Sequence, residues 1–251
     1  MSSEPRVDLR GKHAVVTGGV RGIGLGVAAL LAGNGIRVSI VSRSAHPRHD
    51  ARFFGAAADV AVEDQVIAAF EACRAQNGAV DIVVNAAGIA ESAPLTRTSA
   101  VLWEQTLAIN LTGTFLCARE AAKDMTVAGW GRIVNVASTA GLGGAPYLAA
   151  YCASKHGVVG FTRAIAAEFD GTGITANAVC PGYTETDMMR KAISNISKYT
   201  GAGEDEARAR LAQSNPQGRI ATVEEVAAAV YDLVSGSRNG AAVVIPGDAN
   251  G

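Results

Sequence analysis

The sequence predicts an α/β fold in which a doubly wound parallel sheet forms one domain over residues 1–251, with a helical lid beside its ligand crevice. Three observations support this fold. Short runs rich in Val and Ile alternate with segments of helical periodicity, glycine-rich turns follow several of these runs, and 49% of the residues are hydrophobic. Continuous apolar strands between helices are typical of a parallel sheet that is covered on both faces.

The expected elements follow one another in a regular order. The apolar runs predict strands at 13–17, 37–42, 52–58, 80–85, 132–137, 175–179 and 241–246. Helical periodicity predicts helices at 23–32, 62–75, 99–125, 150–169 and 223–235. Gly18, Asn85, Ser138 and Pro181 each come just after a strand. Because parallel strands end at one edge of a sheet, these four residues are expected to border the same crevice.

Two stretches interrupt the alternation. Residues 42–52 are too few, and too rich in His, Pro and Arg, for a crossover helix, so a turn or a single helical turn is expected there. Residues 188–215 are polar and helix-prone, and they lie between a Pro-Gly turn and a helix. We interpret them as a mobile lid over the substrate, with an ordinary surface excursion as the alternative.

Composition excludes several classes of protein. The formal net charge is −1 and both signs are spread along the chain, so a nucleic-acid partner is not expected. No stretch of about eighteen apolar residues would span a membrane, and the N-terminal residues lack a signal-peptide core, which makes the cytoplasm the expected location. The cysteines have no metal-ligand spacing and are expected to be free thiols, with no metal bound: Cys73, Cys117, Cys152 and Cys180.

A glycine-rich segment predicts a phosphate site. Residues 17–24 read Thr-Gly-Gly-Val-Arg-Gly-Ile-Gly, directly after a strand and at the start of a helix. Glycines let the backbone approach a pyrophosphate, and the helix N-terminus supplies N–H donors and a favourable dipole. A purely structural turn is the alternative. The candidate dinucleotide contacts are Gly18, Arg21, Gly22, Ile23 and Gly24.

The end of the second strand bears on the choice of dinucleotide. An acidic residue there would bind the ribose hydroxyls of NAD and repel the 2′-phosphate of NADP. This chain has Ser42 and Arg43 instead, and Arg21 lies within the glycine-rich segment. Two guanidinium groups, with Arg48 as a third, could hold the 2′-phosphate, so NADP(H) is the preferred cofactor. NAD(H), with Arg43 stacked on the adenine, is the alternative.

The pair Asp59-Val60 follows the third strand. Its carboxylate could accept a hydrogen bond from the adenine amino group. Asp is also common in loops and at helix N-termini, so a structural role before the next helix is an equal alternative.

Tyr151 and Lys155 are four residues apart in a predicted helix and should share one face. A free tyrosine has a pKa of about 10, and a nearby ammonium group stabilises the phenolate. Tyr151 could then exchange a proton with a carbonyl or alcohol oxygen, to which Ser138 could also hydrogen-bond. By itself, a Tyr-Lys pair on a helix is usually a pair of solvent-exposed surface residues without a catalytic role.

The order of the motifs is more specific than any one of them. Along the chain stand TGGVRGIG at 17–24, Asp59-Val60, NAAG at 85–88, Asn110, Ser138, YCASK at 151–155 and PGYTET at 181–186. With these motifs the chain resembles the short-chain dehydrogenase/reductase family over nearly its whole length. The resemblance implies a Rossmann-type fold and an NAD(P)-dependent oxidoreductase in a single dinucleotide-binding catalytic domain.

The resemblance also implies roles for individual residues. Asn110, Ser138, Tyr151 and Lys155 would form a catalytic tetrad, in which Asn110 holds, through its helix, a water that links Lys155 to solvent. Lys155 would also bind the nicotinamide ribose. Asn85, Ala86 and Gly88 would line the adenosine side of the cofactor, next to Asp59 and Val60. Thr184 and Thr186, after Pro181 and Gly182, would contact the nicotinamide carboxamide, which implies transfer of the pro-S hydride.

Two segments depart from the family pattern. The usual Asn-Asn-Ala-Gly reads Asn85-Ala86-Ala87-Gly88 here, and the usual Val-Asp-Gly-Gly end is replaced within residues 245–251. The second departure affects a common subunit contact of the family. In the family, the helices that carry Asn110 and Tyr151 pair with those of a neighbouring subunit, so the resemblance implies a homodimer or homotetramer. The small residues at 150–167 fit such close approach, but they could equally pack on the chain's own sheet.

The region 154–188 resembles ketoreductases of aromatic polyketide pathways and bacterial 3-hydroxyacyl-CoA dehydrogenases. The expected reaction is reversible reduction of a ketone to a secondary alcohol, on a 3-oxoacyl thioester or a bulky aryl ketone. Met188, Met189 and Ile193 in the lid favour an apolar substrate, and Tyr147 is expected to line its pocket. The alternatives are a catabolic dehydrogenase of secondary or amino alcohols that uses NAD, and a non-catalytic nucleotide-binding regulator.

Overall fold

Strands of the computed structural model, which describes residues 6–45 and 52–245, pair into one sheet in the order β3-β2-β1-β4-β5-β6-β7. Every pairing in this sheet is parallel. The strands are β1 (His13–Thr17), β2 (Arg37–Ser42), β3 (Phe53–Ala57), β4 (Ile82–Asn85), β5 (Gly131–Val136), β6 (Ile174–Pro181) and β7 (Ala242–Ile245). The chain order reverses between β1 and β4, so the doubly wound sheet predicted from the sequence is confirmed.

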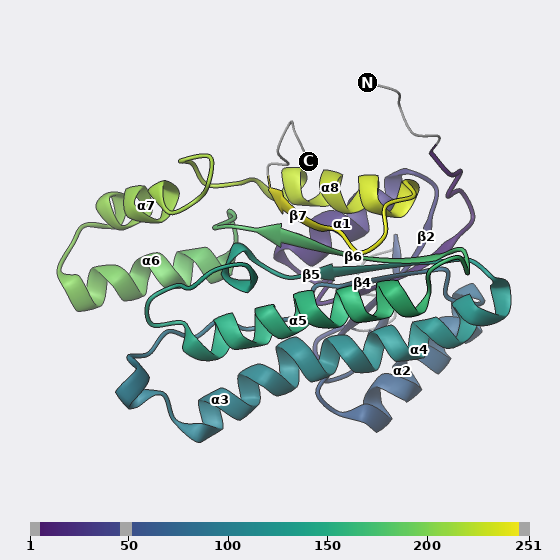
Figure 1. The fold of residues 1–251 in the computed structure, drawn as a ribbon, viewed down its shortest axis with the longest axis horizontal. Helices are drawn as coiled ribbons and strands as arrows, with labels where there is room; N and C mark the ends of the chain where they lie inside the picture. The colour runs from purple at the N-terminus through teal and green to yellow at the C-terminus, as the bar shows by residue number, and fades with distance from the viewer. Residues whose placement is uncertain (1–5, 46–51, 246–251) are drawn as a thin grey trace.

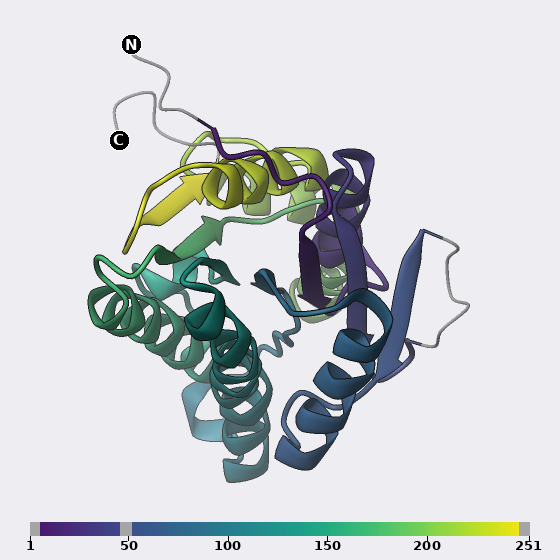
Figure 2. The ribbon, with the colours of Figure 1, turned by 90° about the vertical axis from the view of Figure 1, so that its right-hand side faces the viewer.

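Helices cover both faces of the sheet, as Figures 1 and 2 show. On one face, α1 (Gly22–Gly33) and α8 (Val223–Ser235) contribute apolar side chains to a core with β1, β2 and β4. On the other face, α2 (Glu63–Asn77), α4 (Gly113–Ala128) and α5 (Ala149–Glu168) pack over the sheet. Because both faces are buried, β1, β4 and β5 are buried along their whole length.

The long helix expected at 99–125 has an irregular centre. It consists of α3 (Ala100–Leu107), a π-helical segment (Ala108–Thr112) and α4, which follow one another without a break. Asn110 lies at the middle of the π-helical segment. The apolar periodicity of the sequence predicts a helix here, but it cannot reveal that one turn of the helix is widened. Such π-helical turns are frequent at functional sites.

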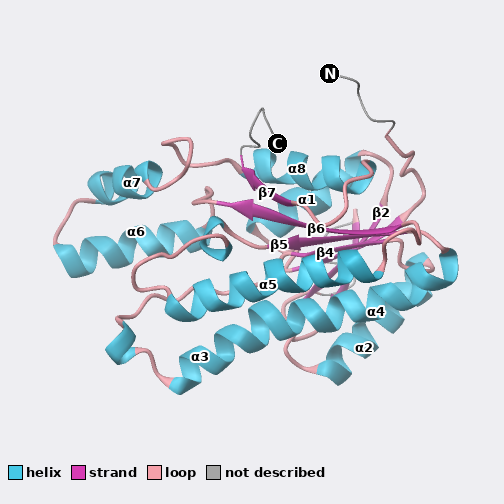
Figure 3. Ribbon diagram, in the orientation of Figure 1, coloured by secondary structure: helices cyan, strands magenta, loops and turns pink. Residues whose placement is uncertain are grey.

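The excursion between β6 and α8 is a helical hairpin beyond the carboxyl ends of the strands (Figure 3). Its helices are α6 (Asp187–Thr200) and α7 (Glu204–Gln213). The hairpin has a small apolar core of its own, in which Met189 and Ile193 of α6 pack against Ala207 and Leu211 of α7. This segment therefore folds largely on itself, at the edge of the sheet where a ligand would enter.

Two other expectations concern segments at the limits of the described chain. A turn at Arg43–Ser44 follows β2. The rest of the stretch for which a turn or a single helical turn was expected lies largely outside the described residues, at 46–51. Arg48, the third candidate for the 2′-phosphate, lies outside the described residues. So do residues 246–251, which carry most of the unusual C-terminal pattern.

The described part of the chain has no helix that is long and apolar enough to cross a membrane. Within residues 6–45 and 52–245, no group of His, Cys, Asp and Glu side chains is placed to hold a metal ion. All four cysteines are free, as expected.

A buried histidine joins β1 to its neighbours. His13 has no exposed surface, and its ring lies between the Gly78 carbonyl (Nδ1 to O, 2.8 Å) and the Ser39 hydroxyl (Nε2 to Oγ, 2.8 Å). The carbonyl only accepts, so Nδ1 carries the proton and Nε2 accepts from Ser39. Burial lowers the pKa of His13 below its ordinary value, so the ring is neutral in the folded chain.

We therefore expect the free energy of unfolding to fall when the pH is lowered from about 7 to about 5.5. In this range His13 of the unfolded chain becomes protonated, because its pKa there has the ordinary value, while the buried ring of the folded chain stays neutral. Proton binding therefore favours the unfolded state, and it lowers the free energy of unfolding by up to about 1.4 kcal/mol per pH unit. Urea titrations at several pH values should show this slope in the wild type and a shallower one in His13→Gln. Equal slopes in the two proteins would contradict the assignment.

Candidate active site

The ends of four strands form one edge of the sheet. Thr17, the last residue of β1, is in register with Val41 of β2 and Asn85 of β4, and Asn85 is in register with Asn135 of β5. Gly18 donates from its amide to the Val41 carbonyl (2.8 Å). Because β1, β4, β5 and β6 are parallel and paired in sequence across the sheet, the residues that follow them lie at its carboxyl edge, where the sequence analysis expected the crevice.

Tyr151 and Lys155 lie on the same face of α5. The Lys155 ammonium is 5.7 Å from the centroid of the Tyr151 ring and donates to the Val136 carbonyl at the end of β5 (Nζ to O, 2.7 Å). Ser138, two residues further on, is buried, and its side chain hydrogen-bonds Tyr151. Three of the four expected catalytic side chains are therefore brought together where β5 meets the start of α5.

Burial controls the ionisation of this pair. It raises the pKa of Tyr151 to about 12, although the hydrogen bond with Ser138 acts in the opposite direction. Burial also lowers the pKa of Lys155 to about 8. The sequence predicted that the lysine would stabilise the phenolate, but desolvation by burial has the largest effect on the pKa of Tyr151. Tyr151 is therefore a protonated acid at neutral pH.

Asn110 holds the loop after β4. Its Oδ1 accepts from the Ile89 amide (2.9 Å), and its Nδ2 donates to the Ile89 carbonyl (2.9 Å) and to the Ser154 hydroxyl (3.0 Å). A Cβ atom at Gly88 would lie 3.2 Å from Asn110 Oδ1 and 3.8 Å from Lys155 Nζ. Glycine at 88 therefore lets this loop pass close to both polar side chains.

Ser154 is a site residue that the sequence reasoning missed. It is fully buried, and its hydroxyl donates to the Tyr151 carbonyl (2.7 Å) while it accepts from Asn110. It thus joins Asn110 to the first turn of α5. The available signal was its position three residues after Tyr151, which places both on one side of a helix.

The glycine-rich turn is shaped for close approach. Gly18 and Gly22 have φ angles of +68° and +54°, which glycine adopts without strain. A Cβ atom at Gly24 would lie 2.5 Å from the Gly18 carbonyl oxygen. Arg21 is the N-cap of α1 but gives it no side-chain cap, and the first turn holds no acidic residue. The first N–H groups of α1, with Ile23 partly buried among them, are therefore left for an anion.

Two arginines lie close to the glycine-rich turn along the chain, one within it and one just after β2. Arg21 at the start of α1 and Arg43 in the turn after β2 are both exposed. Within the described part of the chain neither guanidinium has an ion-pair partner, whereas most other arginines pair with a carboxylate. Ser42 is the last residue of β2 and is half-buried. Among residues 6–45 and 52–245, the charge at the end of β2 is thus basic and is not paired with a carboxylate.

The remaining adenosine-side candidates take part in packing. Asp59 Oδ1 accepts from the Ala61 amide (3.0 Å) in the turn before α2, while the N-cap of α2 is Val62. Val60 is buried in the core. Asn85 is 3% exposed and donates to Asn135 Oδ1 (2.8 Å). Because the side chains of Val60 and Asn85 are engaged in this packing, only their main-chain groups could contact a cofactor.

The turn after β4 rests on β1. The amides of Ala86 and Ala87 both donate to Thr17 Oγ1 (3.1 Å each). A Cβ atom at Gly18 would lie 2.9 Å from the backbone of Ala87, so glycine is needed there. This contact places Ala86 directly beside the glycine-rich turn.

The segment after β6 lies across the same turn. Pro181, the last residue of β6, pairs with Ile245 of β7, and Gly182 follows it. Thr184 is buried, and Thr186 caps α6 by accepting from the Met189 amide. A Cβ atom at Gly22 would lie 3.5 Å from the Thr186 methyl group, so this segment and the start of α1 face one another.

Asn215 is a second residue that the sequence reasoning missed. Its side chain is buried; Oδ1 accepts from the Tyr183 amide (2.7 Å), and Nδ2 donates to the carbonyls of Tyr183 (2.8 Å) and Arg219 (2.7 Å). A Cβ atom at Gly182 would collide with Asn215 Oδ1. The fold of the segment after β6 therefore depends on a residue beyond α7, and no local spacing indicated it.

The three apolar residues expected to face a substrate from the hairpin do not all do so. Met189 and Ile193 are 2% and 7% exposed because they form the core between α6 and α7. Met188 is 43% exposed. The prediction was wrong for Met189 and Ile193, since an amphipathic helix with a partner of its own turns its apolar face inward.

Known proteins share this architecture. The family model of short chain dehydrogenases matches residues 12–197. The chain is 39% identical to D-threitol dehydrogenase of Mycolicibacterium smegmatis, over 95% of this chain and 93% of that one. It is 34% identical to the 3-oxoacyl-acyl-carrier-protein reductase FabG of Aquifex aeolicus, over 91% of this chain and 92% of that one.

A solved structure extends the similarity to the fold. A single-residue variant of actinorhodin polyketide ketoreductase with NADPH superposes with a TM-score of 0.88 at 35% identity, covering 93% of this chain and 95% of that one. The parallel sheet with helices on both of its faces agrees with these matches. This chain belongs to the short-chain dehydrogenase family and is an oxidoreductase that interconverts ketones and alcohols.

Proposed function

We propose that the chain is an NADP(H)-dependent ketoreductase in which Tyr151 is the catalytic acid/base. The observation that carries this proposal is the grouping of Tyr151, Lys155 and Ser138 at the carboxyl end of β5. The uncapped start of α1 and the close packing at Gly24 fit the pyrophosphate of a dinucleotide. When bound, the nicotinamide supplies or accepts the hydride.

The residues of the chain account for the proton and for orientation. Tyr151, protonated at neutral pH, is suited to donate a proton to a ketone oxygen as it becomes an alcohol. The Ser138 hydroxyl would hydrogen-bond the same oxygen. Lys155 would bind the nicotinamide ribose and, when charged, favour the phenolate left on Tyr151. Asn110 would hold the water that leads from Lys155 to solvent.

The preference for NADP(H) rests on Arg21 and Arg43. Both guanidinium groups are exposed and unpaired among the described residues, and they flank the place where the adenosine ribose would lie. A 2′-phosphate would neutralise the positive charge of both arginines, whereas the ribose hydroxyls of NAD are usually bound by an acidic side chain. A solved relative with NADPH supports the same preference.

Replacing Arg43 with alanine is expected to raise the KM for NADPH by about 10- to 100-fold, the effect of losing one charge-assisted contact with a phosphate. The KM for NADH should change by less than about twofold, because NADH lacks that phosphate. Steady-state kinetics with each cofactor measure both values. Arg238→Ala is the control, since Arg238 is exposed in the loop before β7, at the opposite edge of the sheet. Equal effects of Arg43→Ala on both cofactors would contradict the assignment.

For the substrate we propose a 3-oxoacyl thioester or a bulky aryl ketone, since the chain is similar to a 3-oxoacyl reductase and to a polyketide ketoreductase. The α6–α7 hairpin would act as the lid over it. The similarity to a threitol dehydrogenase favours a second candidate, oxidation of a secondary alcohol in catabolism. Absorbance of the reduced nicotinamide, followed with both cofactors against ketones and alcohols of graded size, distinguishes these candidates. No turnover of any of them would favour a non-catalytic regulator.

We also propose that α4 and α5 pair with the same helices of a second copy, giving a homodimer or homotetramer. Phe115 is 40% exposed and packs edge-on against Phe161 (centroids 6.1 Å apart), beside a groove between the two helices. Gly160 has open space around it. An exposed aromatic pair next to small residues suits close approach of another helix pair.

A further inference from the structure

Three segments that border the active site are tied together through the loop after β4. Asn110 holds the base of this loop at Ile89. Further along it, Glu91 pairs with Lys191 of α6 (Oε1 to Nζ, 2.8 Å), and the Ala93 amide donates to the Tyr147 carbonyl (2.9 Å). The α6 helix, this loop and the segment before α5 thus form a continuous rim.

Tyr147 has a strained backbone on this rim. Its φ angle is +65°, and it is the one non-glycine residue with positive φ in the described part of the chain. A side chain strains the backbone in this region, and glycine would avoid that strain. The hydrogen bond from Ala93 uses only the main chain of residue 147, so glycine could make it equally well. What tyrosine adds at this position is its ring.

The ring is presented to solvent rather than to the core. Tyr147 is 66% exposed, although it stands four residues before Tyr151. Met188 is 43% exposed and precedes Lys191 by three residues, so both lie on the side of α6 that turns toward Glu91. An exposed aromatic ring and an exposed thioether are thus carried by two of the three segments that form this rim.

We infer that Tyr147 is a specificity-determining residue, whose ring stacks on the aryl part of a ketone while the carbonyl group of that ketone reaches Tyr151. Met188 would contact the same aryl group from α6. Offset stacking between aromatic rings and contacts of methionine sulfur with rings are both favourable, and both select flat, unsaturated substrates over small aliphatic ones. This inference rests on the proposed ketoreductase function and narrows its substrate class to aryl ketones.

Variants at position 147 separate the ring from the strain. Tyr147→Gly removes both, Tyr147→Ala removes the ring and keeps a Cβ atom, and Tyr147→Phe keeps the ring. We expect the glycine variant to melt about 2–4 °C above wild type, because the strain is relieved. For 2-acetonaphthone, kcat/KM should fall by about tenfold in the glycine and alanine variants and stay near wild type in the phenylalanine variant. For butanone it should change by less than twofold in all three.

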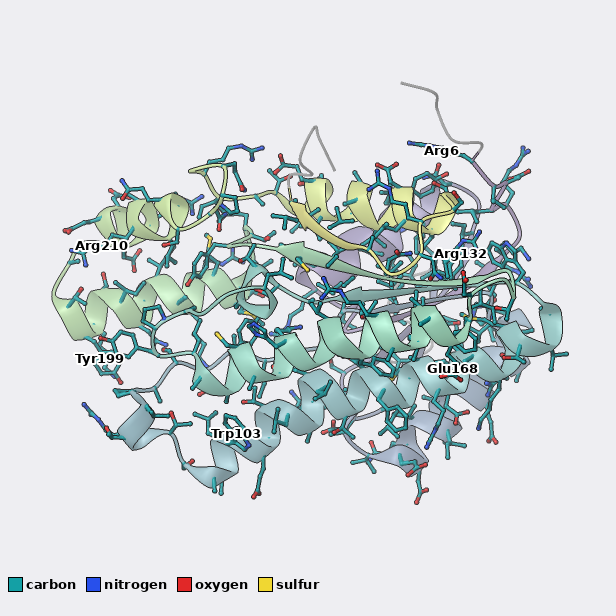
Figure 4. All side chains as sticks on the ribbon, in the orientation of Figure 1. Arg6, Trp103, Arg132, Glu168, Tyr199 and Arg210 are labelled. Carbon is teal, nitrogen blue, oxygen red and sulfur yellow. The ribbon has the colours of Figure 1, made fainter. Side chains whose placement is uncertain are left out.

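The control is Tyr199→Ala, which removes an even more exposed tyrosine (79%) at the outer end of α6, labelled in Figure 4. It should leave both ketones unaffected. A purely structural tyrosine would instead lose stability and activity together, for both ketones alike. An unchanged ratio of kcat/KM for the two ketones in Tyr147→Gly and Tyr147→Ala would overturn the inference while leaving the ketoreductase function intact.

A binding measurement tests, independently of turnover, whether the Tyr147 ring binds an aryl group. Titration calorimetry of the NADP⁺-loaded protein with 2-acetonaphthone should give about tenfold weaker binding in Tyr147→Gly than in Tyr147→Phe. If wild type turned over neither ketone, the proposed reaction would fail, and this difference would still show whether the ring binds an aryl group. Equal affinities of the two variants would overturn the inference.

Discussion

Tyr151→Phe is expected to lower kcat by about 10²–10⁴-fold, the usual contribution of a positioned acid or base. Only the hydroxyl is lost, so the ring keeps its place beside Lys155, and the ammonium keeps its bond to the Val136 carbonyl. The dissociation constant of NADPH should therefore change by less than about threefold. Stopped-flow or steady-state absorbance measures the first quantity, and fluorescence titration the second.

The control for this variant is Tyr231→Phe, which changes a half-buried tyrosine of α8 on the opposite face of the sheet. It should retain full activity. If Tyr151→Phe kept more than about a tenth of the wild-type kcat, the proton would have to come from another group, and the assignment of Tyr151 would be wrong.

Gly24→Ala is expected to weaken dinucleotide binding by more than tenfold and to lower the free energy of unfolding by about 1–3 kcal/mol, the usual cost of overpacking. The added Cβ atom would lie 2.5 Å from the carbonyl oxygen of Gly18 and 2.8 Å from its carbonyl carbon. Both are backbone atoms at the end of β1, so no side-chain rotation relieves the overlap. The start of α1 must move away from the site where the pyrophosphate would bind.

Gly33→Ala in the same helix is the matched control. Gly33 is the last residue of α1 and has no atom within 4 Å of a built Cβ. Alanine there should raise the free energy of unfolding by about 0.5–1 kcal/mol, because alanine is the better helix former, and leave dinucleotide binding unchanged. Urea unfolding and NADPH titration of both variants test the pair. If Gly24→Ala and Gly33→Ala had similar stabilities and similar NADPH affinities, close packing at Gly24 would not be the reason for the glycine there.

Much of the fold follows from local pattern. The strands at 13–17 and 37–42 and the helix at 223–235 have the predicted bounds, since an apolar run or a helical period ends there at a turn residue or a cap. The site residues of the family motifs fall at one edge of the sheet for the same reason. Order along alternating strands and helices is enough to place them.

What the sequence did not predict depends on residues that are far apart in the chain. Asn215 binds Tyr183 across 32 residues, and no period or spacing indicates such a pair. Met189 and Ile193 turn away from the crevice because α7 covers them. The pKa of Tyr151 depends on how deeply its hydroxyl is buried, which the four-residue spacing to Lys155 does not reveal.

Asn110 and Asn215 share a property that bears on the width of the crevice. Each uses its side-chain amide to satisfy both the N–H and the C=O of one residue just past a strand, Ile89 after β4 and Tyr183 after β6. A side-chain amide has the donor and acceptor of a peptide unit, so each asparagine stands in for one residue of an adjacent strand. The segments after β4 and after β6 are thus held in place by side chains rather than by further strand pairing, at the end of the sheet where the proposed site lies.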